Sequence, residues 1–189
     1  MHHRVRPAGR FLHHLQAFLR KGGLIAYPAE GSYGLGCLPD YAPALRRLIA
    51  LKKRAQYKGL IVIGADFAQL RPLLAPVSAA ESKAIMREWP APKTLLLPAR
   101  QRVLPLLRGR GRHNLAVRIP DLDTARFLCK AAGTALVSTS CNRAGKKACK
   151  TEREVRRQFG CQVLILGGRT GGRRQPSQII DWASGKRLR

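Results

Sequence analysis

The chain has 189 residues, 45% of them hydrophobic, which suits one domain with a buried core and is short for two. It carries 36 Lys and Arg against 10 Asp and Glu, a net charge of +26 that bears on partners more than on fold. No apolar run approaches a membrane span, and the basic N-terminus is followed by residues too polar for a signal peptide. We therefore expect a cytoplasmic protein without membrane contact.

Apolar spacing and turn residues predict helices and strands that alternate along the chain. In the first half, the pattern predicts a helix over 11–19, a strand over 24–27, a glycine-rich turn over 31–36, a helix over 44–51 and a strand over 60–63. In the second half, it predicts helices over 79–89, 124–132 and 151–159, and strands over 94–97, 115–119, 135–137, 163–166 and 179–180. Thr124 is expected to cap its helix, and Thr151 with Glu154 fits a capping box. This alternation indicates an α/β fold with a mixed sheet, in a single domain over 1–189.

The cysteines and histidines do not indicate a metal site. The five cysteines include no CxxC pair, and their odd number together with the absence of a secretion signal favours reduced thiols. No histidine joins a cysteine cluster at zinc-ligand spacing, so we expect no structural metal.

Three cations stand close together in the sequence. Lys52, Arg54 and Lys58 lie between the predicted helix 44–51 and the predicted strand 60–63. Such a junction places side chains at the rim of an open sheet, where they can neutralise phosphate charge in a nucleotidyl or phosphoryl transfer. The alternative is a cationic helix C-terminus that complements the helix dipole. The common nucleotide motifs are missing: the chain has neither a Walker A loop nor a completed GxGxxG.

A second polar stretch follows the predicted strand 135–137. Ser138, Thr139, Ser140 and Asn142 are short donors that could bind phosphate or carboxylate oxygens, or could simply form a turn. The basic, glycine-rich segment 167–174 is either a flap that faces phosphate or a surface loop.

Two charged residues stand in apolar surroundings. Glu30 follows the first predicted strand and could hold Mg²⁺, orient a lysine or form a structural salt bridge. Arg118 interrupts an apolar strand, so a buried Arg118 needs an anionic partner, either a substrate carboxylate or a neighbouring Asp; in an edge strand it would point to water.

The net charge favours a polyanion such as RNA, whose binding would weaken steeply with salt. Only 6% of the residues are aromatic, which disfavours recognition of single strands by base stacking.

Six motifs in sequence order resemble one family, the short bacterial form of the threonylcarbamoyl-adenylate synthases, known as YrdC-like. The chain has YPAEGSYGLG at 27–36, LKKRAQYKGL at 51–60, WPAPKT at 89–94, LAVRIP at 115–120, LVSTSCN at 136–142 and PSQIID at 176–181. The corresponding family patterns are YPTETxYGLG, KxRxxxK, WPGPxT, LAVRxP, LVSTSAN and PSxIxD.

The resemblance implies a twisted open sheet with flanking helices and a deep, basic concave surface. It implies conversion of L-threonine, bicarbonate and ATP, with Mg²⁺, to threonylcarbamoyl-adenylate and pyrophosphate. A separate transferase complex would then use this product to form N6-threonylcarbamoyladenosine at position 37 of tRNA. The implied catalytic residues are Lys52 and Arg54.

The implied binding residues fall into two groups. For the nucleotide they are Lys52, Arg54, Lys58, Ser140, Asn142 and Arg189. For threonine they are Arg118, Ser138 and Ser177.

The chain departs from the family patterns at a few positions. Ala29 and Gly31 remove hydroxyls that could recognise threonine, Ala55 replaces a common proline, and Ala91 replaces a glycine and must avoid positive φ. The alternative function is a non-catalytic protein that binds double-stranded or ribosomal RNA during ribosome maturation. Such a protein would tolerate the departures and would also use the +26 charge.

Overall fold

The structure is a computed structural model that describes residues 9–55 and 57–189. The basic N-terminal stretch and Gln56, which belongs to the motif at 51–60, lie outside the described residues. Among the residues that are described, no helix is long and apolar enough to cross a membrane.

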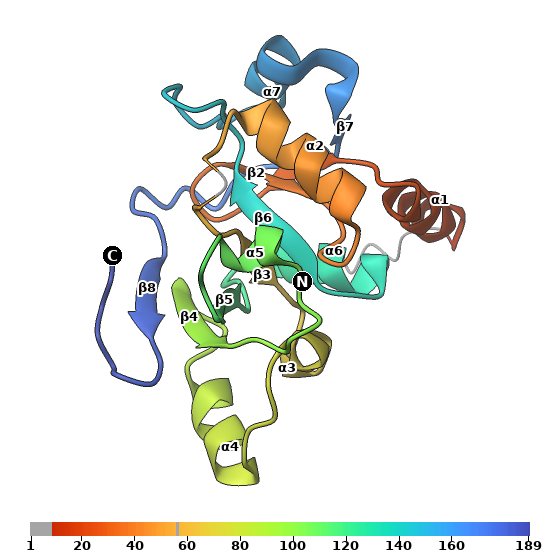
Figure 1. The fold of residues 1–189 in the computed structure, drawn as a ribbon. Helices are drawn as coiled ribbons and strands as arrows, with labels where there is room; N and C mark the ends of the chain where they lie inside the picture. Colours follow the sequence, from red (N-terminus) through yellow and green to blue (C-terminus); the bar gives the residue numbers. More distant parts are fainter. Residues whose placement is uncertain (1–8, 56) are drawn as a thin grey trace, which may run out of the picture.

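One mixed sheet of eight strands forms the centre of the molecule (Figure 1). Its order is β7-β1-β2-β6-β3-β5-β4-β8. The strands are β1 (Ile25–Pro28), β2 (Tyr33–Gly36), β3 (Ile61–Ile63), β4 (Lys93–Pro98), β5 (Asn114–Arg118), β6 (Leu136–Ser140), β7 (Leu164–Ile165) and β8 (Gln178–Asp181). The pairs β1–β7, β3–β5 and β4–β8 are parallel, and the other neighbours are antiparallel. The predicted α/β fold with a mixed sheet is therefore confirmed.

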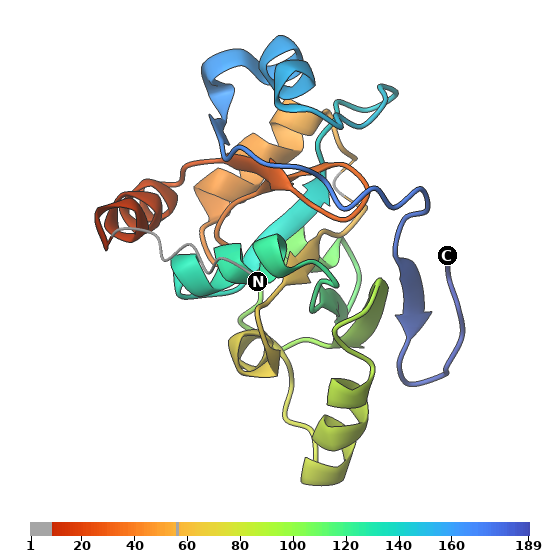
Figure 2. The same cartoon turned by 180° about the vertical axis from the view of Figure 1, so that it is seen from behind.

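Helices cover both faces of this sheet (Figures 1 and 2). They are α1 (Gly9–Arg20), α2 (Ala42–Lys52), α3 (Phe67–Leu70), α4 (Ala79–Arg87), α5 (Pro105–Arg108), α6 (Asp123–Ala132) and α7 (Glu152–Phe159), with the 3-10 helices η1 (Arg71–Leu73) and η2 (Gly160–Gln162). The short helices α3 and α5 were not predicted, because four residues give too little periodicity to read.

Alternation along the strands divides the core into two clusters. Ile25 and Tyr27 of β1 pack with α1 and α6 on one face, whereas Ala26 belongs to the larger cluster that includes α2 on the other. Neighbouring residues of a strand point to opposite faces, so a fully buried strand such as β1 supplies both clusters.

Three local predictions were wrong. Residues 33–36 form β2 rather than a turn: a Cβ on Gly34 would lie 3.0 Å from the ring of Tyr27, and one on Gly36 would lie 2.6 Å from the carbonyl oxygen of Val137. These glycines serve close packing inside a strand. Ser138, Thr139 and Ser140 belong to β6 instead of following it.

The third wrong prediction concerns a helix cap. Helix α6 begins at Asp123, with Leu122 at its N-cap and no capping side chain, so Thr124 lies inside the helix. By contrast, the capping box of Thr151 and Glu154 at the start of α7 is confirmed. All five cysteines are free, as expected, and Ala91 does not have a positive φ.

Candidate active site

A cavity of about 530 Å³ opens where the turn between β1 and β2, the ends of β3 and β6, the segment before β8 and the C-terminus meet. It brings together six of the residues predicted from the sequence to form the site: Arg54, Arg118, Ser138, Ser140, Ser177 and Arg189. These residues come from distant parts of the chain, so the sheet topology assembles the cavity.

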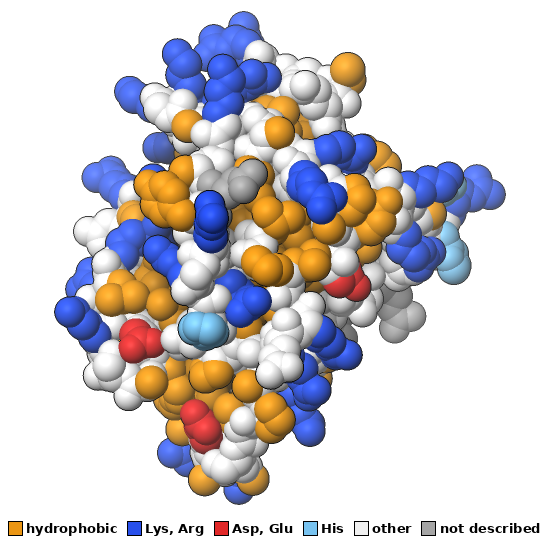
Figure 3. Space-filling view, viewed as in Figure 1, with side chains coloured by type: hydrophobic (Ala, Val, Ile, Leu, Met, Phe, Trp, Pro, Cys, Tyr) orange, Lys and Arg blue, Asp and Glu red, His pale blue; other side chains and the backbone are white. Residues whose placement is uncertain are grey.

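The charge lining this cavity is strongly positive. Among the described residues that line it, one has an acidic side chain, Glu30, and seven are cations: Arg54, Arg118, Lys147, Lys150, Arg173, Arg174 and Arg189. Positive charge is also spread over the rest of the surface, as Figure 3 shows for one face. Because positive charge is widespread, it does not by itself locate the site. The site is located by the cavity that cations line.

Burial and mutual repulsion act on the arginines of the cavity. Burial lowers the pKa of Arg54, and the nearby charge of Arg189 lowers it further. The pKa of Arg189 is likewise lowered by burial and then by the charge of Arg118. Arg189 thus repels both Arg54 and Arg118, and an anion placed beside Arg189 would relieve that repulsion.

Arg118 and Glu30 form a buried ion pair at the wall of the cavity. Arg118 Nη1 lies 3.0 Å from Glu30 Oε1, but the angle does not fit a hydrogen bond, and within residues 9–55 and 57–189 Arg118 Nε has no hydrogen-bond partner. β5 lies between β3 and β4, so Arg118 is in an interior strand rather than an edge strand. Its protein partner is Glu30 rather than an Asp, and its unused donors leave capacity for a second anion.

Lys52 is a buried residue behind the cavity wall. Its ammonium donates to the carbonyl oxygens of Ser140 and Asn142, the latter at 2.9 Å, and lies 3.3 Å from Asn142 Oδ1. Burial, with a smaller effect of the charge on Arg54, lowers the pKa of Lys52 to about 8. Neither Lys52 nor Asn142 lines the cavity; together they fix the backbone where β6 ends.

The loop after α2 carries the other two predicted cations, Arg54 and Lys58, and only the first of them lines the cavity. Arg54 lines the cavity, and its guanidinium is held by the carbonyl oxygens of Lys58, at 3.2 Å, and Gly59, at 2.8 Å. The Lys58 side chain is exposed, with its ammonium 5.8 Å from the centre of the Tyr57 ring, and it does not line the cavity.

The hydroxyls of the cavity come mainly from β6 and from the residues before β8. Ser138, Thr139 and Ser140 all line it, and Ser140 Oγ donates to Asn142 Oδ1 at 2.7 Å. Ser177 Oγ lies 3.0 Å from Thr94 Oγ1, and Arg189 donates to the Ser177 carbonyl oxygen. The C-terminal arginine is thereby held at the same cavity.

The segment between β7 and β8 runs across the turn between β1 and β2 (Figure 2). Gly171 N donates to the Ala29 carbonyl oxygen at 3.0 Å, and Arg173 N donates to that of Glu30 at 2.8 Å. A Cβ on Gly31 would lie only 2.6 Å from the Arg173 carbonyl oxygen. Because Gly31 has no side chain, this basic segment can pack against the turn and form one wall of the cavity.

Sequence reasoning missed Lys147 and Lys150 as lining residues. They lie on the return of the loop that follows β6, which is folded back by Cys149 N donating to Cys141 O at 2.8 Å. The density of lysines in this loop was the only signal in the sequence.

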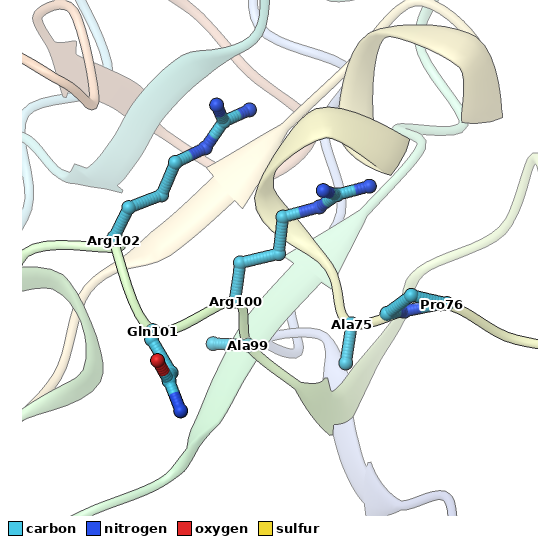
Figure 4. A pocket seen from close by; sticks show the side chains of 6 residues that line it. All are labelled: Ala75, Pro76, Ala99, Arg100, Gln101 and Arg102. Atoms are coloured by element: carbon cyan, nitrogen blue, oxygen red, sulfur yellow. The ribbon is translucent and has the colours of Figure 1, made fainter.

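A smaller cavity lies away from this site (Figure 4). It has a volume of about 390 Å³ and is lined by Ala75, Pro76 and the residues 99–102. Arg100 and Arg102 extend side by side from the loop after β4, and each donates to a nearby backbone carbonyl. This cavity shares no lining residue with the candidate active site, so the two cavities are distinct.

Comparisons with known proteins give a consistent result. The family model Sua5/YciO/YrdC, described as "Telomere recombination", matches residues 17–189. The threonylcarbamoyl-AMP synthase of Neisseria gonorrhoeae is 61% identical over 175 residues, which cover 93% of each chain. That of Chromobacterium violaceum is 52% identical over 183 residues, which cover 97% of this chain and 94% of the relative.

A solved structure extends this likeness to the fold. The structure of P. abyssi Sua5 complexed with L-threonine has a TM-score of 0.81 and 30% identity, and the match covers 94% of this chain. This chain spans about half of that protein, 52% of its length.

Proposed function

Because the chain belongs to the Sua5/YciO/YrdC family, we propose that it is a threonylcarbamoyl-AMP synthase that converts L-threonine, bicarbonate and ATP to threonylcarbamoyl-AMP and pyrophosphate. The observation that carries the proposal is the clustering of Arg54, Arg118 and Arg189 around one cavity beside the hydroxyls of β6. We further propose that the domain extends over all of 1–189 and that the protein acts in the cytoplasm.

The chemistry explains why the cavity needs so many cations. The amine of threonine forms a C–N bond to the carbon of bicarbonate, a C–O bond breaks, and water leaves, which gives a carbamate. A carbamate oxygen then attacks the α-phosphorus of ATP; the bond from that phosphorus to the bridging oxygen of the β-phosphate breaks, and pyrophosphate leaves. Nucleophile and phosphates are both anionic, so fixed positive charge must offset their repulsion. The carbamate oxygen is already ionised and needs no histidine base.

We assign the triphosphate to Arg54, with Ser140 and Arg189 contacting the nucleotide. Lys52 and Asn142 act as positioning residues, since their hydrogen bonds fix the end of β6. Lys58, whose side chain is exposed, would reach the phosphates only by moving inward from its present position.

We assign the threonine carboxylate to Arg118, whose Nε is unpaired among the described residues and whose planar guanidinium suits a bidentate carboxylate. Ser138 and Ser177, both buried at the cavity wall, would hold the rest of the amino acid. Ala29 and Gly31 contribute no hydroxyl, but Ser32 also lines the cavity.

A magnesium ion would be held mainly by the substrate. Glu30 has the one acidic side chain among the described residues that line the cavity, and it is paired with Arg118. Mg²⁺ usually keeps several waters and binds through one or two carboxylates together with phosphate oxygens. The cavity therefore fits a magnesium–nucleotide complex better than a resident metal.

The identity to named synthases favours catalysis over the alternative of a non-catalytic RNA-binding protein. We propose that the product passes to a tRNA threonylcarbamoyl transferase complex. The widespread surface charge in Figure 3 is compatible with contact to tRNA during that step.

The test is pyrophosphate release by the purified protein with ATP, Mg²⁺ and bicarbonate. We expect the release of pyrophosphate to require both threonine and bicarbonate. The rate should fall at least about tenfold when serine replaces threonine, because serine lacks the methyl group that would pack against the pocket. Folded protein that releases no pyrophosphate with threonine would refute the proposal.

A further inference from the structure

A second large cavity lies outside the candidate active site. It has a volume of about 800 Å³ and opens between the C-terminal end of α1, helix α2 and the segment that includes η2. Its wall includes Phe18, Lys21, Arg47, Arg143 and Gln162, and it shares no lining residue with the active-site cavity.

The charge of this cavity is positive and unbalanced. Lys21, Arg47 and Arg143 line it, and no Asp or Glu does so among the described residues. None of these three cations takes part in an ion pair in the described part of the chain. Three cations that line one cavity without an acidic side chain favour an anionic ligand with more than one charge.

Two of the cations are already held in place. Arg47 donates to the carbonyl oxygen of Gly22, and the guanidinium of Arg143 lies 5.9 Å from the centre of the Phe159 ring. Arg143 Nη2 also lies 3.4 Å from Gln162 Oε1. A guanidinium has five N–H donors, so each arginine keeps donors free for a ligand while losing little further freedom on binding.

The remaining wall is apolar. Phe18 packs directly over the backbone of Gly23, where a Cβ would come within 2.2 Å of the ring, and Leu24 and Leu51 lie beside it. We propose that this cavity is a second anion-binding site, which takes the polyphosphate group of pyrophosphate or of a nucleoside polyphosphate.

The proposed anion site and the active-site cavity are connected by the loop that follows β6. Arg143 follows Asn142, which holds Lys52, and the next residue, Ala144, donates from its backbone N to the Lys52 carbonyl oxygen at 2.8 Å. An anion bound to Arg143 therefore contacts the loop that fixes the end of β6. The proposal of an anion site does not depend on the reaction catalysed in the other cavity.

Isothermal titration calorimetry with pyrophosphate, and separately with a non-hydrolysable ATP analogue, tests the proposal at fixed ionic strength. We expect the wild-type chain to bind two anions and the Lys21→Gln/Arg47→Gln variant to bind one. If the event that the variant loses is tighter with the ATP analogue than with pyrophosphate, the site recognises a nucleotide. If the two affinities are equal, it recognises the polyphosphate group alone. Both results support the site.

The matched control is Lys83→Gln/Arg87→Gln on α4, which removes the same charge from exposed positions that line neither cavity. It should keep both binding events. A wild-type chain whose every binding event persists in the Lys21→Gln/Arg47→Gln variant, or an equal loss in the control, would overturn the proposal. If the Lys21→Gln/Arg47→Gln variant unfolds because Arg47 no longer donates to Gly22, the single variant Lys21→Gln takes its place. Lys21→Gln should weaken binding at the proposed site about fivefold, and unchanged affinity would be contrary to the proposal.

Discussion

Arg118 of β5 and Glu30 of the turn after β1 form a buried ion pair, with 3.0 Å between Arg118 Nη1 and Glu30 Oε1. The pair holds an arginine at the cavity wall, and Arg118 Nε is left without a partner in the part of the chain that the structure describes. A charge inside a protein needs an opposite charge, and here one carboxylate satisfies only part of the guanidinium.

Replacing Glu30 by Gln should destabilise the protein by about 3 kcal/mol, because Arg118 is left as a buried, unpaired charge. L-threonine should raise the melting temperature of this variant more than that of the wild type, since its carboxylate would supply the missing anion. Thermal denaturation with and without threonine measures both effects.

Glu152→Gln is the matched control, since it removes a carboxylate from a solvent-exposed pair with Arg156. It should cost less than about 1 kcal/mol and show no added response to threonine. Equal losses in the two variants would contradict the account of the Arg118–Glu30 pair.

The Gly31→Ala substitution should displace the segment between β7 and β8. The new Cβ would meet the Arg173 carbonyl oxygen at 2.6 Å, which is backbone and cannot simply turn aside. We expect a loss of about 1–3 kcal/mol in unfolding free energy and a raised KM for ATP, because Arg173 and Arg174 would shift.

Gly9→Ala provides the comparison for Gly31→Ala. Nothing lies within 4 Å of a Cβ at Gly9, in the first turn of α1, so this change should be neutral or slightly stabilising. A Gly31→Ala protein with the stability and KM of the wild type would show that the segment does not need this close approach.

Lys52 should make stability depend on alkaline pH. Its pKa is about 8 in the folded chain, below the ordinary value of 10.5, so the unfolded chain binds the proton more tightly. Stability relative to a Lys52→Met variant should therefore rise as pH increases from about 8 to about 10.5, by about 3 kcal/mol at most. Urea denaturation of both proteins across this range measures it, and a constant or falling difference would contradict the depressed pKa.

Much of the fold could be predicted because the apolar spacing of β1, α2 and α6 reflects their burial. β2 could not, because Gly34 and Gly36 suggest a turn until the packing of Tyr27 on them is known. The burial of Lys52 was open to prediction: it follows Leu45, Leu48 and Ile49 on the same face of α2, where all four are buried.

The cavity was predictable only in part. Arg118 stands out as a charge in an apolar strand, and the hydroxyls of 138–140 form a visible group. Lys147 and Lys150 reach the cavity through the fold of a loop, which is fixed by tertiary hydrogen bonds such as Tyr33 N to Cys149 O. Such contacts leave no local pattern in the sequence.

The most direct measurement is kcat/KM for threonine-dependent pyrophosphate release by Arg54→Ala beside Arg46→Ala. Arg54 lines the cavity, whereas Arg46 is exposed on α2 and lines neither of the large cavities. We predict that Arg54→Ala remains folded and loses at least about 100-fold, the scale of one removed electrostatic contact to a developing charge, and that Arg46→Ala stays within about twofold of the wild type. Near wild-type turnover by Arg54→Ala would contradict the assignment of this cavity as the active site.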